Sequence, residues 1–326
     1  MHYDVFNGDA DGIIALLQLR LSEQKQSKLV TGVKRDIKLL SQVVKCNDVS
    51  SVTTLDVSME KNLEPLTELL NKGIKVFYCD HHRTGDIPAS EWLTSVIDLD
   101  AEKCTSLLIH QYLEDQYGEN LYVAWAIAGA FGDNLLSTAT ALANVCGYST
   151  EQVDFLKELG TLINYNGYGS SLSDLHIEPA ELYRELLAFP NPFDLLKDQN
   201  SPYYRLKQGY AEDYQNVNSL IPTYVDEVCA VYEFPAEPWA RRISGVFGND
   251  LANQAPSKAH AVLTLNPSNK DYTVSVRAPL TNRVGADDIC SQFPTGGGRK
   301  GAAGINKLPI EQKSAFIHAL SRHYSA

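Results

Sequence analysis

The sequence predicts an α/β protein with an N-terminal parallel-sheet domain and a smaller C-terminal α/β domain. Three observations support this. A chain of 326 residues exceeds what one hydrophobic core usually organises. Within the first hundred residues short apolar strands alternate with helical stretches, a pattern typical of a parallel sheet. New strand candidates begin after residue 228. We therefore expect a catalytic domain over 1–190, a helical linker over 191–227 and a substrate-binding domain over 228–326.

The expected elements of the first domain follow one another in strand–helix order. Four short apolar runs predict parallel strands at Tyr3–Phe6, Val52–Leu55, Ile74–Cys79 and Ser95–Ile97. Helical spacing of apolar residues predicts helices over Ile13–Leu21, around Leu63–Leu70, over Thr105–Tyr117 and Leu121–Phe131, and over about 138–162. The segment 164–173 is rich in Asn, Gly, Tyr and Ser, so we expect a mobile loop there.

The second domain offers three further strands and a C-terminal helix. The strands are expected at Cys229–Phe234, Ala259–Leu265 and Tyr272–Ala278, and the helix at Ile310–His323. A glycine-rich segment, Gly296–Gly298, lies between the last strand and that helix and is expected to form a loop.

Composition excludes several classes of protein. No apolar run approaches the roughly 18 residues of a membrane-spanning helix, and the N-terminus reads directly into a strand, so we expect a soluble, cytoplasmic protein. The six cysteines are scattered and form no C-x-x-C pair, which indicates reduced thiols. Of the net charge of −12, the tail from Lys270 carries +4 (eight Lys and Arg against four Asp and Glu) and the rest −16. Such an acidic body argues against binding long nucleic acid.

Acidic residues and histidines follow three of the predicted strands, where ligands bind in parallel sheets. They are Asp9 and Asp11 after the first strand, Asp56 after the second, and Asp80, His81 and His82 after the third. Carboxylates gathered in one crevice repel one another unless cations compensate them. Oxygen ligands with an imidazole suit Mn²⁺ or Mg²⁺, and the histidine favours Mn²⁺. Each aspartate has an alternative role as the cap of the next helix.

These motifs together resemble the DHH phosphoesterase family. The matching stretches are Asp9-Ala10-Asp11-Gly12, Asp56 and Asp80-His81-His82. The resemblance implies two metal ions, with Asp9 on the first, Asp56 bridging, and Asp11, His81 and Asp133 on the second. It implies that Asp80 and His82 lie around the metals or contact phosphate. Where many relatives carry a histidine or a further aspartate this chain has Val5 and Asn7, so Asn7 is a weaker candidate ligand for the first metal.

The C-terminal part extends the resemblance to substrate-binding residues. Arg277 within a predicted strand, followed by Gly296, Gly297, Gly298 and Arg299, matches the family's G-G-G-H-x-x-A-A-G loop, with Arg299 in place of histidine. Glycines allow backbone N–H groups to approach a phosphate, and an arginine can grip it with two hydrogen bonds. The resemblance thus implies an active site in the cleft between the two domains, with these residues and His82 binding substrate.

The expected activity is hydrolysis of linear dinucleotides or very short oligoribonucleotides to 5′-mononucleotides by two-metal water attack. Tyr165 and Tyr168 are candidates for stacking on bases. Three alternatives stay open: a cyclic-dinucleotide phosphodiesterase, a 3′-phosphoadenosine 5′-phosphate phosphatase, and a nucleotide sensor without turnover. The expected partner is a small nucleotide, with a homodimer as a possible assembly and no membrane or long nucleic acid.

Overall fold

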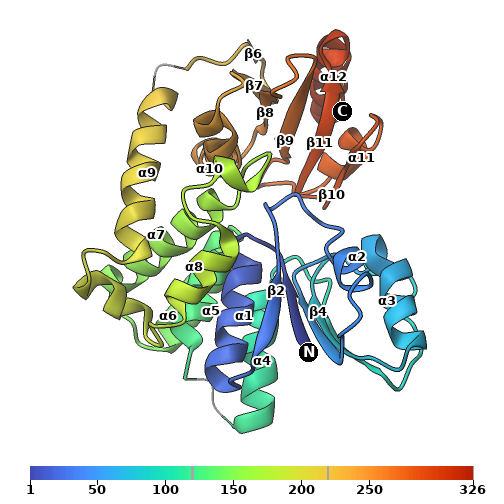
Figure 1. The fold of residues 1–326 in the computed structure, drawn as a ribbon. Coiled ribbons are helices and arrows are strands. Elements are labelled where there is room, and N and C mark those ends of the chain that lie inside the picture. Colours follow the sequence, from blue (N-terminus) through green and yellow to red (C-terminus); the bar gives the residue numbers. More distant parts are fainter. Residues whose placement is uncertain (119–120, 219, 326) are drawn as a thin grey trace. The chain divides into compact units, whose positions relative to one another are not determined.

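The structure, a computed structural model, describes residues 1–118, 121–218 and 220–325. The chain divides into two compact units, Met1–Gly209 and Tyr210–Ala326 (Figure 1). The finer domain bounds expected from the sequence stay a prediction. Within the described residues, no helix combines the length and the apolar composition needed to cross a membrane.

The first unit contains a sheet of five parallel strands, as the sequence predicted. The strands are β1 (His2–Phe6), β2 (Ser27–Val30), β3 (Ser51–Leu55), β4 (Lys75–Asp80) and β5 (Leu93–Ile97), in the order β2-β1-β3-β4-β5. Four of them were predicted, and β2 was missed. The order reverses direction between β1 and β3, which in open α/β sheets is the point where ligands bind.

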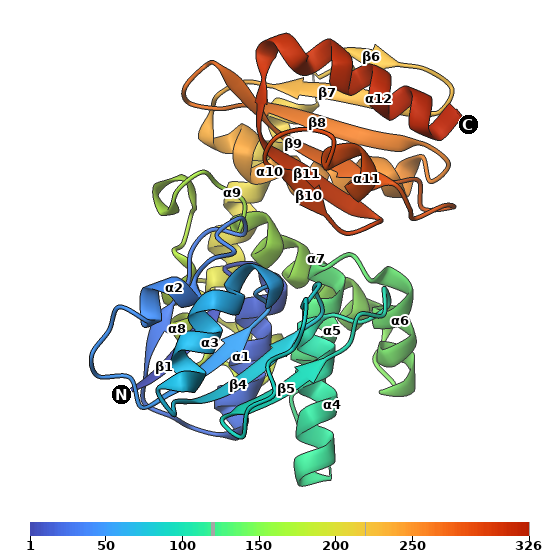
Figure 2. The same cartoon turned by 90° about the vertical axis from the view of Figure 1, so that its right-hand side faces the viewer.

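Helices cover both faces of this sheet (Figures 1 and 2). On one face α1 (Ala10–Ser22), α4 (Thr105–Tyr117) and α5 (Val123–Gly132) pack against one another. On the other face α2 (Leu40–Val43) and α3 (Leu63–Asn71) close a core with apolar side chains of the strands, including Tyr3, Val5, Val52 and Val76. The remaining helices of the chain up to residue 217 are α6 (Leu136–Val145), α7 (Thr150–Asn166), α8 (Pro179–Leu186) and α9 (Pro202–Val217), with short 3₁₀ turns at Glu60–Asn62, Leu172–Asp174 and Pro192–Lys197.

Two helical predictions were wrong in detail. The helical region expected over about 138–162 contains two helices, because Gly147 takes a left-handed φ of 72° just after α6. The loop expected from residue 164 begins later, because α7 continues through Tyr165 to Asn166. The side chain of Asn166 accepts hydrogen bonds from the backbone of His176 (3.1 Å) and Ile177 (3.2 Å), a tertiary contact that the local sequence does not reveal.

The second unit contains a mixed sheet of six strands in the order β10-β11-β9-β8-β7-β6. The strands are β6 (Tyr224–Val225), β7 (Cys229–Phe234), β8 (Ala259–Leu265), β9 (Asp271–Arg277), β10 (Gly296–Gly298) and β11 (Ala302–Pro309). Its helices are α10 (Pro238–Gln254), α11 (Ala286–Cys290) and, after a 3₁₀ turn at Ile310–Gln312, α12 (Lys313–Ser325). The three predicted strands are confirmed, whereas α10 and β11 were missed. The glycine-rich segment is a strand, not a loop, because its glycines pair with β11.

The cysteines are free thiols, as expected. Four of the six are buried: Cys79, Cys104, Cys229 and Cys290.

Candidate metal centre

The predicted acidic residues gather at the carboxyl edge of the five-stranded sheet. Asp9 and Asp11 follow β1, Asp56 follows β3, and Asp80 ends β4 just before the two histidines. All four of these aspartates are buried. Parallel strands present their carboxyl ends on one edge, which brings side chains far apart in sequence to one place.

Three of the predicted ligands, Asp11, Asp56 and Asp133, surround one nitrogen of a fourth, the Nε2 atom of His81. Nε2 lies 3.4 Å from Asp56 Oδ1, 3.7 Å from Asp11 Oδ2 and 4.0 Å from Asp133 Oδ2. A small divalent ion holds its ligands at about 2.0–2.2 Å, so neighbouring ligand atoms are separated by roughly 3 Å and opposite ones by roughly 4 Å. The three distances from Nε2 lie in this range, and we call Asp11, Asp56, His81 and Asp133 the His81 cluster. Among the described residues, Asp56, His81 and His82 have ligand atoms that all lie within 4.8 Å of one another.

The other ring nitrogen of His81, Nδ1, has a backbone partner that orients the ring. Nδ1 lies 2.8 Å from the backbone oxygen of Lys103, and a carbonyl oxygen can only accept a hydrogen bond. Nδ1 therefore carries a proton, which leaves Nε2, the nitrogen facing Asp11, Asp56 and Asp133, as the ring atom that can bind a metal ion. This is the usual way in which a protein orients a metal-binding histidine.

Asp11 is held by the N-terminus of α4. Its two carboxylate oxygens accept hydrogen bonds from the backbone N–H groups of Thr105 and Ser106, both at 2.7 Å. The first N–H groups of a helix have no partner within the helix and favour a negative charge nearby. The helix thus keeps a buried carboxylate in place next to His81.

Asp56 has a left-handed backbone conformation and a raised pKa. Its φ is 56°, a left-handed conformation that costs energy for any residue except glycine and that gathers at functional sites. Burial, followed by the negative charges of Asp9 and Asp11, raises its pKa well above the ordinary value. A divalent ion would compensate those charges and allow Asp56 to ionise.

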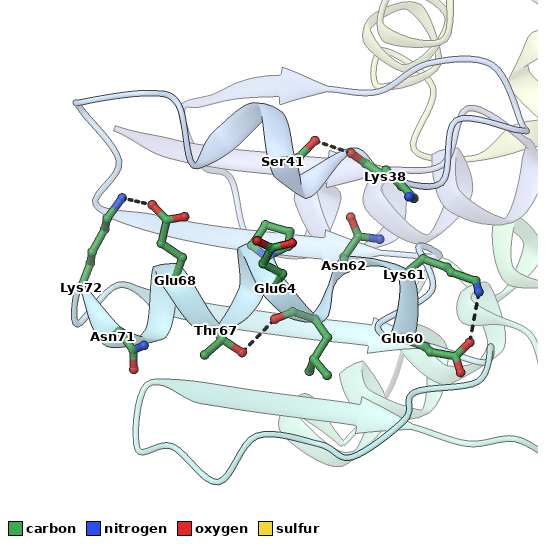
Figure 3. Close-up of a pocket in the computed structure, with 12 residues that line it drawn as sticks. Lys38, Ser41, Glu60, Lys61, Asn62, Glu64, Thr67, Glu68, Asn71 and Lys72 are labelled. Atoms are coloured by element: carbon green, nitrogen blue, oxygen red, sulfur yellow. Dashed lines mark hydrogen bonds and ion pairs between the residues drawn. The ribbon is translucent and has the colours of Figure 1, made fainter.

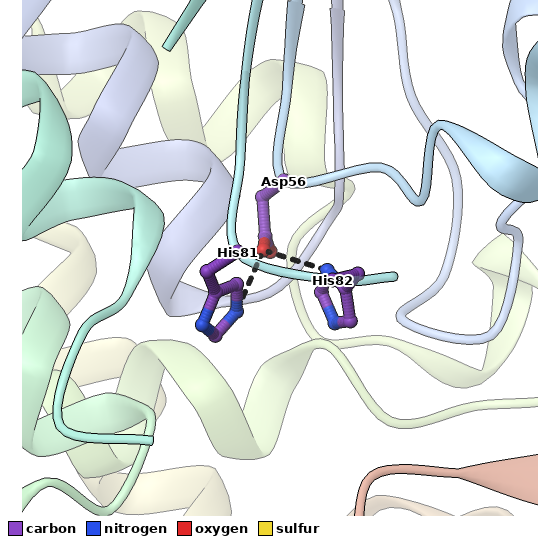
Figure 4. Close-up of side chains that lie close together, drawn as sticks. All are labelled: Asp56, His81 and His82. Atoms are coloured by element: carbon purple, nitrogen blue, oxygen red, sulfur yellow. Dashed lines mark ion pairs between the residues drawn. The ribbon is translucent and has the colours of Figure 1, made fainter. Parts of the chain in front are cut away.

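Asp80 and His82 form a pair beside this cluster. Asp80 Oδ1 accepts a hydrogen bond from His82 Nδ1 at 2.7 Å, and the same nitrogen lies 3.8 Å from Asp56 Oδ1. Burial alone would raise the pKa of Asp80, but the two histidines lower it. Asp56, His81 and His82 lie close together in Figure 4. Since Asp80 engages Nδ1, Nε2 is the ring nitrogen of His82 with which a substrate oxygen can interact.

Asp9 lies in a different environment, which we call the Lys34 cluster and define as Asn7, Asp9, Lys34 and Asn164. Asp9 Oδ1 accepts a hydrogen bond from Gly12 N at 3.1 Å and caps α1, while Oδ2 receives Lys34 Nζ at 2.5 Å. Burial would raise the pKa of Asp9, but the Lys34 charge lowers it. Asn7 Oδ1 is buried, and no described residue donates a hydrogen bond to it.

The tyrosines expected to stack on bases do not fit that role. Tyr165 is fully buried within α7, and its hydroxyl lies 2.7 Å from His176 Nε2. Tyr168 is only 7% exposed, and its ring lies beneath Lys34 Nζ at 5.2 Å. This expectation was wrong because the chain from 164 to 168 packs as the end of a helix.

The predicted substrate-binding residues of the second unit are largely engaged within it. Arg277 Nε donates to Asn249 Oδ1 at 2.6 Å, and Nη2 donates to Gly245 O at 3.1 Å. A Cβ at Gly296 would lie 1.8 Å from Cys290 O, and one at Gly298 would lie 2.5 Å from Ala303 Cα, so close packing requires both glycines. Only at Gly297 would a Cβ meet no atom within 4 Å. Arg299 closes the turn into β11 through backbone hydrogen bonds with Ala302.

A pocket on the first unit contains none of the predicted site residues. It is lined by charged and polar side chains of α3 and its surroundings, among them Lys38 and Glu64 (Figure 3). Other charged side chains there pair with each other, as Lys72 does with Glu68 at 2.7 Å. This pocket therefore offers no evident chemistry beyond a solvated surface.

Comparison with known proteins identifies the fold. No protein-family model and no curated protein sequence matches the chain. Among solved structures, exonuclease RecJ bound to manganese is 17% identical, with a TM-score of 0.63 over 99% of this chain and 90% of that chain. The pGpG-specific phosphodiesterase PggH from Vibrio cholerae is 13% identical, with a TM-score of 0.57 over 100% and 99%. An exopolyphosphatase-related protein from Bacteroides fragilis is 12% identical, with a TM-score of 0.52 over 99% and 92%. The resemblance to DHH phosphoesterases that the motifs indicated is thus confirmed at the level of the fold, which this chain shares with RecJ and PggH.

Proposed function

We propose that this protein is a metal-dependent phosphodiesterase that hydrolyses linear dinucleotides or very short oligoribonucleotides to 5′-mononucleotides. One observation carries the proposal: carboxylate oxygens of Asp11, Asp56 and Asp133 lie within 4.0 Å of His81 Nε2, at the switch point of a parallel sheet. Three carboxylates and an imidazole are a ligand set for a divalent ion.

The similar structures support a divalent metal and a phosphodiester substrate. The RecJ structure is bound to manganese, and PggH is described as pGpG-specific. Mn²⁺ is the ion that we propose for this chain, with Mg²⁺ as the alternative, because imidazole is a better ligand for Mn²⁺ than for Mg²⁺.

The proposed reaction is in-line hydrolysis. A bound divalent ion would polarise the phosphoryl oxygen and favour the attacking hydroxide. The water oxygen forms a bond to phosphorus while the bond to the 3′ oxygen breaks, and that oxygen receives a proton. The four residues of the His81 cluster would hold the ion, and His82, with Nδ1 bound to Asp80, would donate a hydrogen bond from Nε2 to the phosphate in its imidazolium form.

Charge supports a short substrate. Residues 1–269 carry a net −16, which would repel each further phosphate of a long strand, most strongly at low salt. Arg277, Arg299 and Gly297 belong to the basic tail and are proposed to bind a second phosphate or a sugar.

The experiment is an assay with Mn²⁺ and a panel of linear and cyclic dinucleotides, RNAs of two to ten nucleotides, and 3′-phosphoadenosine 5′-phosphate. We expect kcat/KM to peak at about two or three nucleotides, with 5′-mononucleotide products. Asp56→Ala should be inactive, and the matched control Asp154→Ala, at an exposed position of α7, should be fully active.

Each alternative has its own outcome in this assay. Preferred cleavage of a cyclic dinucleotide or of 3′-phosphoadenosine 5′-phosphate would replace the proposed substrate. Efficiency that rises with strand length would indicate a RecJ-like exonuclease. Tight nucleotide binding without turnover would indicate a sensor.

A further inference from the structure

Lys34 brings a positive charge into the acidic centre. Its Nζ donates to Asp9 Oδ2 at 2.5 Å and to Asn164 Oδ1 at 2.9 Å. The side chain is only 24% exposed, although it ends in an ammonium group. The ammonium therefore lies among a carboxylate and an amide oxygen, which are the ligand types that a divalent ion would use there.

The position of Lys34 is fixed by its backbone. Lys34 follows β2, which runs parallel to β1, so the chain leaves the sheet at the same edge as Asp9. Lys34 N donates to Gly167 O at 2.8 Å, and Lys34 O accepts from Asn7 Nδ2 at 3.2 Å. Gly167 packs closely, because a Cβ there would lie 3.0 Å from Asp9 Cα. The end of α7 and the segment after β1 thus hold this lysine between them.

Each carboxylate oxygen of Asp9 takes part in one of these contacts. Oδ1 caps α1 through Gly12 N, and Oδ2 binds the Lys34 ammonium. A divalent ion on Asp9 would have to displace Lys34 from Asp9 and Asn164 or lie against a like charge. Asp9 is the residue that the family resemblance assigns to the first metal, so the structure and that assignment disagree at this position.

We propose that Lys34 is a built-in cation that takes the place of the first metal ion, so that the centre binds one divalent ion, at the His81 cluster. This inference rests on the metal centre of the proposed function. An ammonium has three N–H donors, and Asp9 and Asn164 use two of them. In this proposal the third N–H donates to a phosphoryl oxygen, where a fixed positive charge stabilises the negative charge of the transition state.

The test is the stoichiometry of Mn²⁺ binding, measured by equilibrium dialysis and by electron paramagnetic resonance at saturating Mn²⁺. Wild type should bind one ion per chain and give the spectrum of an isolated Mn²⁺. Lys34→Ala should bind a second ion at Asp9, and two ions about 3.5–4 Å apart should give a spin-coupled spectrum. Lys34→Gln provides a second variant of similar size, and thermal unfolding shows whether each variant is folded.

Two control variants distinguish loss of the positive charge of Lys34 from a general disturbance of the structure. Lys34→Arg keeps the positive charge and should still bind one ion. Lys38→Ala removes an exposed lysine four residues away and should also bind one. Two ions in wild type, or one ion in both Lys34→Ala and Lys34→Gln, would overturn the inference. If no variant and not even wild type binds Mn²⁺, the proposed metal centre fails, and this inference fails with it.

Discussion

The His81 cluster and the Lys34 cluster lie at the same edge of one sheet, yet they compensate buried carboxylates in different ways. In the first, Asp11, Asp56 and Asp133 surround the Nε2 nitrogen of His81 within 4.0 Å. In the second, an ammonium lies 2.5 Å from the only carboxylate, Asp9. The difference between the two clusters shows that a lysine from a neighbouring loop can neutralise one of several acidic residues that follow parallel strands.

The pKa values of Asp56 and Asp9 are shifted in opposite directions. Burial and neighbouring carboxylates raise the pKa of Asp56, whereas Lys34 outweighs the effect of burial on Asp9 and lowers its pKa. A buried carboxylate without a compensating positive charge has a raised pKa, and a cation that binds beside it lowers that pKa. The predictions below test whether this difference governs metal binding.

Asp56→Ala should have the largest effect. Asp56 contacts both His81 and His82, and loss of residues that merely support a metal ligand already costs about 10–100-fold. We expect kcat/KM on a linear dinucleotide to fall more than about 100-fold while the far-ultraviolet circular dichroism stays that of wild type. Activity close to wild type at saturating Mn²⁺ would refute a role for Asp56 in the centre.

A pair of isosteric substitutions compares the two clusters directly. Asp133→Asn removes a charge 4.0 Å from His81 Nε2 and should weaken Mn²⁺ binding by about 10–100-fold. Asp9→Asn preserves the helix cap, because asparagine caps as well as aspartate, and should leave Mn²⁺ affinity little changed. Isothermal titration with Mn²⁺ measures both, and equal losses of affinity would remove the distinction between the clusters.

Arg277→Ala should change substrate binding without changing metal binding. Loss of a charged hydrogen bond to a phosphate corresponds to roughly tenfold or more in KM. We expect KM for a linear dinucleotide to rise by about that factor at unchanged Mn²⁺ content. Because Arg277 also bonds Asn249, the control is Asn249→Ala, which removes this contact and keeps the guanidinium. A loss of bound Mn²⁺ in Arg277→Ala would contradict the proposed role.

The left-handed backbone conformation of Asp56 predicts that glycine at this position stabilises the fold more than alanine does. At most positions alanine stabilises a fold relative to glycine, but at a φ of 56° alanine is strained. Asp56→Gly should therefore be more stable than Asp56→Ala by about 1 kcal/mol in metal-free urea unfolding. A more stable Asp56→Ala would show that this conformation is relaxed in solution.

A further effect concerns the pH dependence of stability. The raised pKa of Asp56 makes its ionisation unfavourable to the metal-free fold. Its contribution to stability is complete below the ordinary value of 3.8 and is lost as the pH rises through the raised value. The stability of Asp56→Asn relative to wild type should therefore increase from pH 4 to 7, by at most about 1.4 kcal/mol per pH unit. Chelated protein unfolded by urea at each pH measures this, and a constant difference would argue against the raised pKa.

Much of the first sheet was predictable because its strands are short apolar runs that end in acidic residues. β2 escaped prediction because Ser27–Val30 mixes polar and apolar residues and is only half-buried. Without β2, nothing in the sequence places Lys34 at the same edge as Asp9. The lysine was therefore missed, although it lies four residues after the strand.

The residues that support the site depend on contacts between distant segments. Thr105 and Ser106 reach Asp11 across more than 90 residues, and Lys103 orients His81 through its backbone oxygen. A backbone donor or acceptor leaves no signal in the side-chain sequence. Asp133 was identified through the family resemblance, and the structure now places it beside His81.

The most direct test is the anomalous scattering of manganese from a crystal soaked in Mn²⁺, recorded on both sides of the manganese absorption edge. We predict one strong peak among Asp11, Asp56, His81 and Asp133, with Lys34 still bonded to Asp9. A peak between Asp9 and Asp56 that displaces the ammonium would contradict the account of Lys34. No peak at His81 would contradict the metal centre itself.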